Sequence, residues 1–91
     1  MIRQTLEVQN RLGLHARAAA KLVHLASGFQ SQICLSREGE HQKIDSRSIL
    51  GILMLAASRG TRLTVSIEGA DEKEAARAIR HLFQEKFGES D

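Results

Sequence analysis

Hydrophobic and polar residues alternate along two stretches of the chain, residues 2–8 and 61–68. A period of two places successive side chains on opposite faces of a strand, so each stretch predicts a strand with one buried face. A short apolar run at 33–35 predicts a third strand. The Glu-Gly-Glu sequence at 38–40 then predicts a hairpin turn into a weak polar strand at 41–44.

Apolar residues in the segment 16–27 lie three and four positions apart, which is the spacing of one helix face. The residues of this face are Ala19, Leu22, Val23 and Ala26. Gly28 and Phe29 follow, and they suit a helix end at which the glycine is left-handed and the next apolar residue folds back. We therefore expect a helix over 16–27.

Two further helices are expected in the second half of the chain. One runs from about residue 47 to 57, with a member of the Asp-Ser pair at 45–46 as its N-cap. The other begins at Asp71, where Glu74 completes the pattern of a capping box, and Gly88 closes it. The apolar face of this last helix consists of Ala75, Ala78, Ile79, Leu82 and Phe83.

The resulting order of elements is strand, helix, strand, strand, helix, strand, helix. Strands and helices that each have one apolar face predict an α+β fold, a two-layer sandwich with a largely antiparallel sheet. We expect it to form a single domain over residues 1–91. Several unrelated functions use a βαββαβ core, so the fold alone does not decide the function.

The amino-acid composition argues against several classes of structure and function. An apolar content of 42% argues against disorder. A net charge of only +2 and the absence of Trp and Tyr argue against nucleic-acid binding. No apolar stretch reaches the length of a membrane span, the N-terminal residues lack the pattern of a signal peptide, and the single Cys34 fits a reducing compartment. We expect a cytoplasmic monomer without a membrane partner.

The most informative segment is 13–17, Gly-Leu-His-Ala-Arg, which places His15 at the start of the first predicted helix. The first N–H groups of a helix lack partners inside it, and together with the helix dipole they favour a bound phosphate. His15 can cap this end only through an unprotonated ring nitrogen, and a neutral ring is the form that attacks phosphorus. Arg17 supplies a permanent charge for phosphoryl oxygens. On these residues alone, an ordinary surface or capping histidine remains the more economical interpretation.

The segment 13–20, Gly-Leu-His-Ala-Arg-Ala-Ala-Ala, resembles the active-site signature of the HPr family, the histidine-containing phosphocarriers of the bacterial phosphotransferase system. The segment 48–55 resembles the family's second conserved segment, and the strand at 61–68 followed by Gly69 matches as well. The resemblance covers the whole chain. It implies an open-faced βαββαβα sandwich with the helices on one face of an antiparallel four-stranded sheet.

The resemblance implies a stoichiometric phosphocarrier, not an enzyme, with no cofactor and no metal. His15 would accept a phosphoryl group on Nδ1 from enzyme I, which phosphoenolpyruvate charges, and pass it to a histidine of an EIIA-type protein. Arg17 would orient the phosphate, assisted by the backbone N–H groups of Ala16 and Arg17. Ala18 stands where the family usually has proline. We expect this change to loosen the turn by a fraction of a kcal/mol, roughly the scale of such backbone effects.

The resemblance also implies a docking surface on the second helix. This surface is expected around Arg47, Leu50, Gly51 and Met54, with a basic rim of Arg11, Arg17, Lys21 and Arg47. Each of these cations taken singly is better explained as a solvated charge.

Ser48 matches a serine that a dedicated kinase phosphorylates in some branches of the family, which would add a serine kinase to the partners. We prefer to interpret Ser48 as a residue of the first helical turn. The remaining histidines, His24, His41 and His81, lack ligand spacing, so we expect no metal site and no catalytic role for them.

Within the family, the sequence favours the nitrogen-related branch, with a nitrogen-type enzyme I as donor and a nitrogen-type EIIA as acceptor. The reasons are the Ile-Leu-Met-Leu run at 52–55, the helix exit at 57–60 and the tail at 83–91. The alternatives are an HPr of the sugar-transport system and a regulatory binding module without chemistry. A small nucleic-acid-binding domain of similar topology is disfavoured by the composition.

Overall fold

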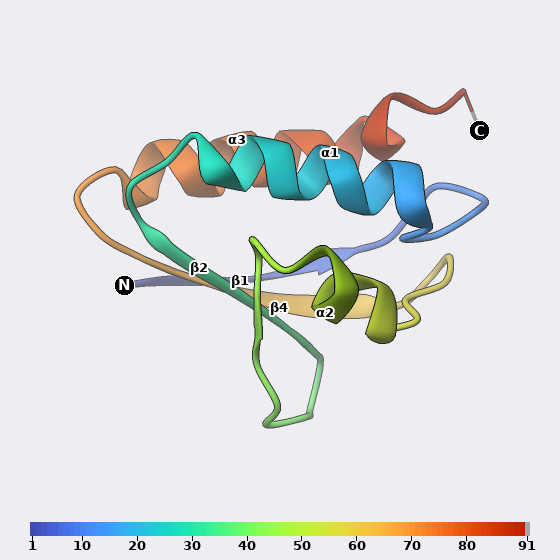
Figure 1. The fold of residues 1–91 in the computed structure, drawn as a ribbon, viewed down its shortest axis with the longest axis horizontal. Coiled ribbons are helices and arrows are strands. Elements are labelled where there is room, and N and C mark those ends of the chain that lie inside the picture. Colours follow the sequence, from blue (N-terminus) through green and yellow to red (C-terminus); the bar gives the residue numbers. More distant parts are fainter. Residues whose placement is uncertain (91) are drawn as a thin grey trace.

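The computed structural model describes residues 1–90, so the last residue of the predicted domain 1–91 and of the tail 83–91 lies outside the described residues. A four-stranded sheet carries α1 and α3 side by side on one face (Figure 1). The elements in chain order are β1 (Ile2–Glu7), α1 (Ala16–Ser27), β2 (Gln32–Arg37), β3 (Ile44–Asp45), α2 (Ile49–Met54), β4 (Arg62–Glu68), α3 (Glu72–Gln84) and the short 3-10 turn η1 (Lys86–Gly88). The predicted α+β sandwich is confirmed.

The sheet has the strand order β1-β4-β2-β3, and every neighbouring pair is antiparallel. On β4 the apolar residues Leu63, Val65 and Ile67 are buried, as their period of two predicts. The predicted hairpin turn follows β2, with Gly39 at a φ of 87°. The strand expected at 41–44 is reduced to the two residues of β3.

The core lies between the sheet and the apolar faces of α1 and α3. Alanine supplies three of the four buried residues of α1 and two of the four of α3, and its small side chain lets the helices approach the sheet closely. The buried residues are Ala18, Ala19, Leu22 and Ala26 on α1, and Ala75, Ala76, Ile79 and Phe83 on α3. Among residues 1–90, no helix combines the length and the apolar character that crossing a membrane requires.

Helix α1 has the predicted bounds, but the conformation expected for Gly28 is wrong. Gly28 has a φ of −80° and donates its N–H to the carbonyl of Leu25 at 3.1 Å. The helix therefore ends in a tighter turn with a right-handed backbone conformation. Phe29 does pack back, partly buried, against the core. The apolar contact of Phe29 is therefore reached without a left-handed residue.

The bounds and the cap predicted for α2 are also wrong. The helix has six residues, and its N-cap is Ser48, whose Oγ accepts from the N–H of Gly51 at 3.1 Å. Asp45 instead accepts from the N–H of Arg47 at 2.8 Å and shapes the turn before the helix. The chain leaves the helix early because Ala56 is left-handed, with a φ of 50°. Ser48 is thus a capping residue and not a residue of the first turn.

At α3, other contacts replace the predicted capping box. Asp71 occupies the N-cap position, but its carboxylate accepts from the backbone N–H groups of Gln30 and Ser31 at 2.8 and 3.0 Å. Glu72 folds back and accepts from the N–H of Gly69 at 3.1 Å. Asp71 therefore ties the start of α3 to the segment after α1, two elements that are distant in sequence.

The C-terminal end of α3 lies earlier than predicted. The helix ends at Gln84, and the left-handed residues Lys86, Phe87 and Gly88 follow, with φ values of 56°, 56° and 77°. Phe87 is fully buried, and its ring centroid lies 4.9 Å from that of Phe83. The reversal brings the C-terminal segment to the end of the molecule where α1 begins (Figure 1).

Candidate functional site

The loop between β1 and α1 is held in place by its own backbone and by one buried amide. Gly13 has a φ of 70°, and a Cβ on it would lie 2.5 Å from the carbonyl oxygen of Ala57. The next residue, Leu14, donates its N–H to that same carbonyl at 2.9 Å. The fully buried Asn10 donates from Nδ2 to the carbonyl of Gly13 at 2.7 Å. Glycine is therefore required here, and the loop delivers His15 to a defined place.

His15 is the N-cap of α1, as the sequence predicts. Its backbone is extended, and Nδ1 of its ring accepts from the N–H of Arg17 at 3.3 Å. This bond is longer than the usual N–H···O distance, and the side chain is 29% exposed. The first turn of α1 contains no acidic residue. The helix end is thus free of a carboxylate of its own.

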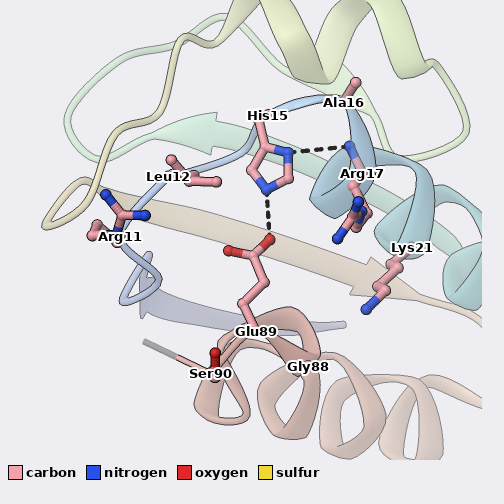
Figure 2. Close-up of a pocket in the computed structure, with 9 residues that line it drawn as sticks. All are labelled: Arg11, Leu12, His15, Ala16, Arg17, Lys21, Gly88, Glu89 and Ser90. Carbon is pink, nitrogen blue, oxygen red and sulfur yellow. Dashed lines mark hydrogen bonds and ion pairs between the residues drawn. The ribbon is translucent and has the colours of Figure 1, made fainter.

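Glu89 contacts the other nitrogen of the ring. Its Oε2 lies 2.5 Å from Nε2 of His15 (Figure 2). Its Oε1 accepts from Nδ2 of Asn10 at 3.0 Å. The Asn10 amide, and after it the His15 ring, hold the pKa of Glu89 below its usual range against an opposing effect of burial. Glu89 is not among the predicted site residues, because a contact between residues 74 positions apart leaves no local pattern in the sequence.

The C-terminal segment is anchored so that Glu89 turns toward His15. Lys21 donates from Nζ to the carbonyl of Phe87 at 2.7 Å. A left-handed non-glycine residue costs about 1–3 kcal/mol, and two of them, Lys86 and Phe87, are adjacent here. Burial of the Phe87 ring contributes about 1.5–3 kcal/mol in the opposite direction. Burial of the ring therefore offsets part of the strain, and the bond from Lys21 helps to hold the reversal in place.

An open cleft of about 620 Å³ lies between the start of α1 and the C-terminal segment. Its lining residues are Arg11, Leu12, His15, Ala16, Arg17, Lys21, Gly88, Glu89 and Ser90. The side chains of Arg17 and Lys21 extend from α1 beside the ring of His15 (Figure 2). A nucleophilic ring, a helix N-terminus and several cations thus line one cleft, which is the arrangement that a phosphoryl group requires.

The predicted basic rim is only partly assembled. Arg11, Arg17 and Lys21 line the cleft with His15. Arg47 does not, because its guanidinium donates to the carbonyl of Phe29 at 3.2 Å, just beyond the C-terminal end of α1. A helix of twelve residues separates the two ends by about 18 Å, so the grouping of Arg47 with the rim is wrong.

The exposed apolar residues of α2 lie where the sequence analysis expects a docking surface. Leu50 and Met54 are 71% and 82% exposed. Leu12 and Ile49, which the sequence analysis did not assign to this surface, are exposed as well. Gly51, in contrast, faces a neighbouring strand: a Cβ on it would lie 2.5 Å from the side chain of Ile44 on β3. Gly51 therefore permits close packing of α2 against β3.

The other candidate ligands lie apart from the cleft. His24 and His41 are exposed, and His81 pairs with Glu85 on the surface of α3 at 3.1 Å. Within residues 1–90, no group of three or more His, Cys, Asp or Glu side chains is arranged to hold a metal ion.

Comparisons with known proteins place this geometry in a family. The model of the PTS-HPr family, described as the PTS HPr component phosphorylation site, matches residues 2–85. The phosphocarrier protein HPr of Xylella fastidiosa is 47% identical over 98% of each chain. A crystal structure of HPr from Thermoanaerobacter tengcongensis superposes with a TM-score of 0.92, at 43% identity and full coverage of both chains. The chain belongs to the HPr family.

Members of the HPr family are phosphocarriers of the phosphotransferase system, so this protein is a carrier and not an enzyme in its own right. The preference for the nitrogen-related branch receives no specific support. The phosphocarrier protein NPr of Escherichia coli is 38% identical over 97% of each chain, below the 47% of the Xylella HPr. The comparisons therefore favour the alternative, an HPr, over the branch that the sequence analysis preferred.

Proposed function

We propose that His15 accepts a phosphoryl group on Nδ1 and holds it in the cleft until an acceptor protein removes it. The observation that carries this proposal is the N-cap position of the ring, whose Nδ1 lies against the N–H of Arg17. Once phosphorus is bound to Nδ1, the phosphoryl oxygens replace the ring nitrogen as acceptors for the N–H groups of Ala16 and Arg17. The Arg17 guanidinium then balances their charge.

The donor in this proposal is enzyme I charged by phosphoenolpyruvate, and the acceptor is an EIIA-type protein. Both partners dock on exposed apolar side chains, which are Leu12 in the lining of the cleft and Ile49, Leu50 and Met54 on α2. Exposed apolar side chains next to a charged rim combine contact area with electrostatic steering. Because the relatives named HPr are the more similar ones, we propose a sugar-type HPr as the first candidate. An NPr of the nitrogen-related system is the second candidate.

The decisive experiment is incubation with phosphoenolpyruvate and enzyme I. We expect an acid-labile, base-stable phosphate on the wild-type protein and none on the His15→Ala variant. His24→Ala is the matched control, because His24 lies on the same helix, is exposed and is distant from the cleft. A wild-type protein that stays unlabelled with both types of enzyme I contradicts the proposal.

Arg17→Ala tests the role of the guanidinium. We expect phosphorylation to slow by about 10- to 100-fold, since the variant loses a hydrogen bond to a charged group. The thermal midpoint should not change, because Arg17 is exposed. Arg80→Ala, at an exposed position on α3, is the matched control for the loss of one positive charge. An equal loss of stability and of rate in Arg17→Ala would indicate a structural role.

The branch is decided by the acceptor. Purified protein phosphorylated on His15 is presented separately to a sugar-type EIIA and to a nitrogen-type EIIA. We expect faster transfer to the sugar-type protein. Faster transfer to the nitrogen-type protein would restore the branch that the sequence analysis preferred.

We also propose Ser48 as a regulatory phosphorylation site. Its hydroxyl caps α2 beside the exposed Ile49 and Leu50, so a phosphate there adds negative charge to the docking surface and weakens transfer. Incubation with a family serine kinase should label the wild-type protein and leave Ser48→Ala unlabelled. Equal labelling of both proteins would contradict this assignment.

A further inference from the structure

We propose that Glu89 is a positioning residue for phosphoryl transfer at His15. Its carboxylate keeps the proton of the neutral ring on Nε2, so that Nδ1 retains the lone pair that attacks phosphorus. The proposal rests on the function proposed above, and it adds the C-terminal segment to the reactive site.

The two contacts of the His15 ring select the same tautomer. An ionised carboxylate has no hydrogen to donate, so Nε2 must donate to Oε2 of Glu89, 2.5 Å away. On the other side of the ring, the backbone N–H of Arg17 can only donate, so Nδ1 must accept. A neutral imidazole has one N–H and one lone pair in the ring plane, and this arrangement uses both.

The carboxylate of Glu89 is held in place from several directions. Oε1 accepts from Asn10, a fully buried residue whose amide also holds the loop before His15. The chain two residues before Glu89 is fixed by the buried ring of Phe87 and by the bond from Lys21 to the Phe87 carbonyl. The lowered pKa of Glu89 keeps its carboxylate ionised at neutral pH. This contact therefore belongs to a connected network, unlike an isolated surface ion pair.

The electron balance of the transfer shows what the contact contributes. The Nδ1 lone pair forms the bond to phosphorus, while the bond from phosphorus to the donor breaks and its electron pair stays with the donor. Nε2 keeps its proton, so the ring gains positive charge as the new bond forms. Glu89 offsets that charge from the Nε2 side, away from the phosphoryl oxygens at the start of α1. On transfer to the acceptor, the electron pair of the nitrogen–phosphorus bond returns to Nδ1 and the same tautomer is restored.

The test compares Glu89→Ala and Glu89→Gln with Glu85→Ala, a matched control that removes an exposed carboxylate near the end of α3. Nitrogen-15 NMR of the His15 ring gives a readout that is independent of activity. We expect the wild-type protein and Glu85→Ala to show an unprotonated Nδ1 and a slowly exchanging proton on Nε2. In Glu89→Ala that proton should exchange rapidly with solvent.

The rate of phosphorylation by enzyme I supplies the second readout. Glu89→Ala should slow it by about ten-fold, the scale of one hydrogen bond to a charged group. The loss should appear in kcat and not in KM, because the contact acts on the ring and not on the docking surface. Glu89→Gln should be intermediate, since its amide oxygen still accepts from Nε2 but has no charge.

Each outcome separates this proposal from the proposed function. If Glu89→Ala retains the wild-type ring spectrum and rate while His15 is still labelled, the positioning role is overturned and the carrier function stands. A wild-type spectrum with the proton on Nδ1 overturns the positioning role as well. If the wild-type protein is not labelled at all, the carrier function fails, whatever the ring spectra show.

Discussion

The N-terminal ends of α1 and α3 are alike in electrostatics and opposite in how the chain uses them. Each end presents backbone N–H groups that lack partners inside the helix, at the positive end of the dipole. The first turn of α3 contains Glu72 and Glu74, and the Glu72 carboxylate folds back onto the N–H of Gly69. The first turn of α1 has no acidic residue, and Arg17 N–H meets the His15 ring nitrogen at 3.3 Å. Carboxylates of the chain lie in and beside the first turn of α3, whereas the first turn of α1 has none and can take an anion from outside.

The difference between the two ends shows why a helix N-terminus alone does not identify a phosphate site. At α3, the Asp71 carboxylate is committed to the segment after α1 through the hydroxyl and the N–H of Ser31 and the N–H of Gln30. That end joins two parts of the structure. At α1, the cap is a ring nitrogen. This nitrogen can give up the hydrogen bond that it accepts from the N–H of Arg17 and bind phosphorus instead. The capacity to bind a phosphoryl group therefore depends on whether the capping atom is committed to a contact elsewhere in the chain.

The strongest test makes α1 resemble α3. Ala16 and Glu72 are the first residues of their helices, so Ala16→Glu places at α1 the carboxylate that α3 already has. We expect phosphorylation of His15 to slow by about 100-fold, because a unit charge several ångströms from the phosphoryl group opposes it. The free energy of unfolding should not fall. Initial labelling rates and a urea titration measure the two effects, and unimpaired labelling would refute the comparison. Glu72→Ala, the reverse change at α3, is the control and should leave the labelling rate unchanged.

Acid unfolding tests the structural role of the α3 end. The Ser31 hydroxyl, and after it the N–H of Gln30, lower the pKa of Asp71 from its ordinary value of 3.8. The unfolded chain therefore binds this proton at a higher pH than the folded chain. The stabilisation is fully present above the ordinary value and is lost as the pH falls through the lowered one. Asp71→Asn should lower the thermal midpoint at neutral pH. In this variant the thermal midpoint should also fall less steeply as the pH is lowered into the acidic range. Phosphorylation should be unaffected, and a large loss of labelling would contradict the division between the two ends.

The start of α2 provides a cap of conventional chemistry with which to compare His15. Ser48→Ala removes the hydroxyl that accepts from Gly51. We expect the free energy of unfolding to fall by about 1 kcal/mol, the usual effect of losing such a cap. The phosphorylation of His15 should continue at the wild-type rate, as measured by labelling with enzyme I. A labelling rate that falls in step with stability would mean that any helix cap in this fold affects the site.

The smallest expected effect concerns Ala18, the third residue of α1 and a fully buried one. Proline tolerates positions near the start of a helix, where the N–H lacks a helical partner. Ala18→Pro should therefore raise the free energy of unfolding by about 0.5 kcal/mol by restricting the unfolded chain. Thermal unfolding measures the change. A decrease in stability would show that the first turn of α1 is packed around alanine.

The elements that the sequence predicts well are those whose signals lie within a few residues. The period of two in β1 and β4 and the apolar face of α1 identify these elements, and α1 has its predicted bounds. The cap at His15 is also local, since Nδ1 reaches an N–H only two residues away. The bounds of α2 are less predictable, because Ala56 ends the helix in a left-handed conformation that alanine does not normally signal.

The sequence by itself determined the order of strands and helices, the place of His15 at a helix start and the resemblance that led to a phosphocarrier. Only the tertiary structure decided that Asp71 serves the segment after α1 and that Arg47 lies away from the cleft. Only the tertiary structure, too, brings Glu89 to the ring of His15. The physical reason is the range of the interactions. Periodicity and caps arise between neighbours in the chain, whereas these contacts form only after the core has brought distant segments together.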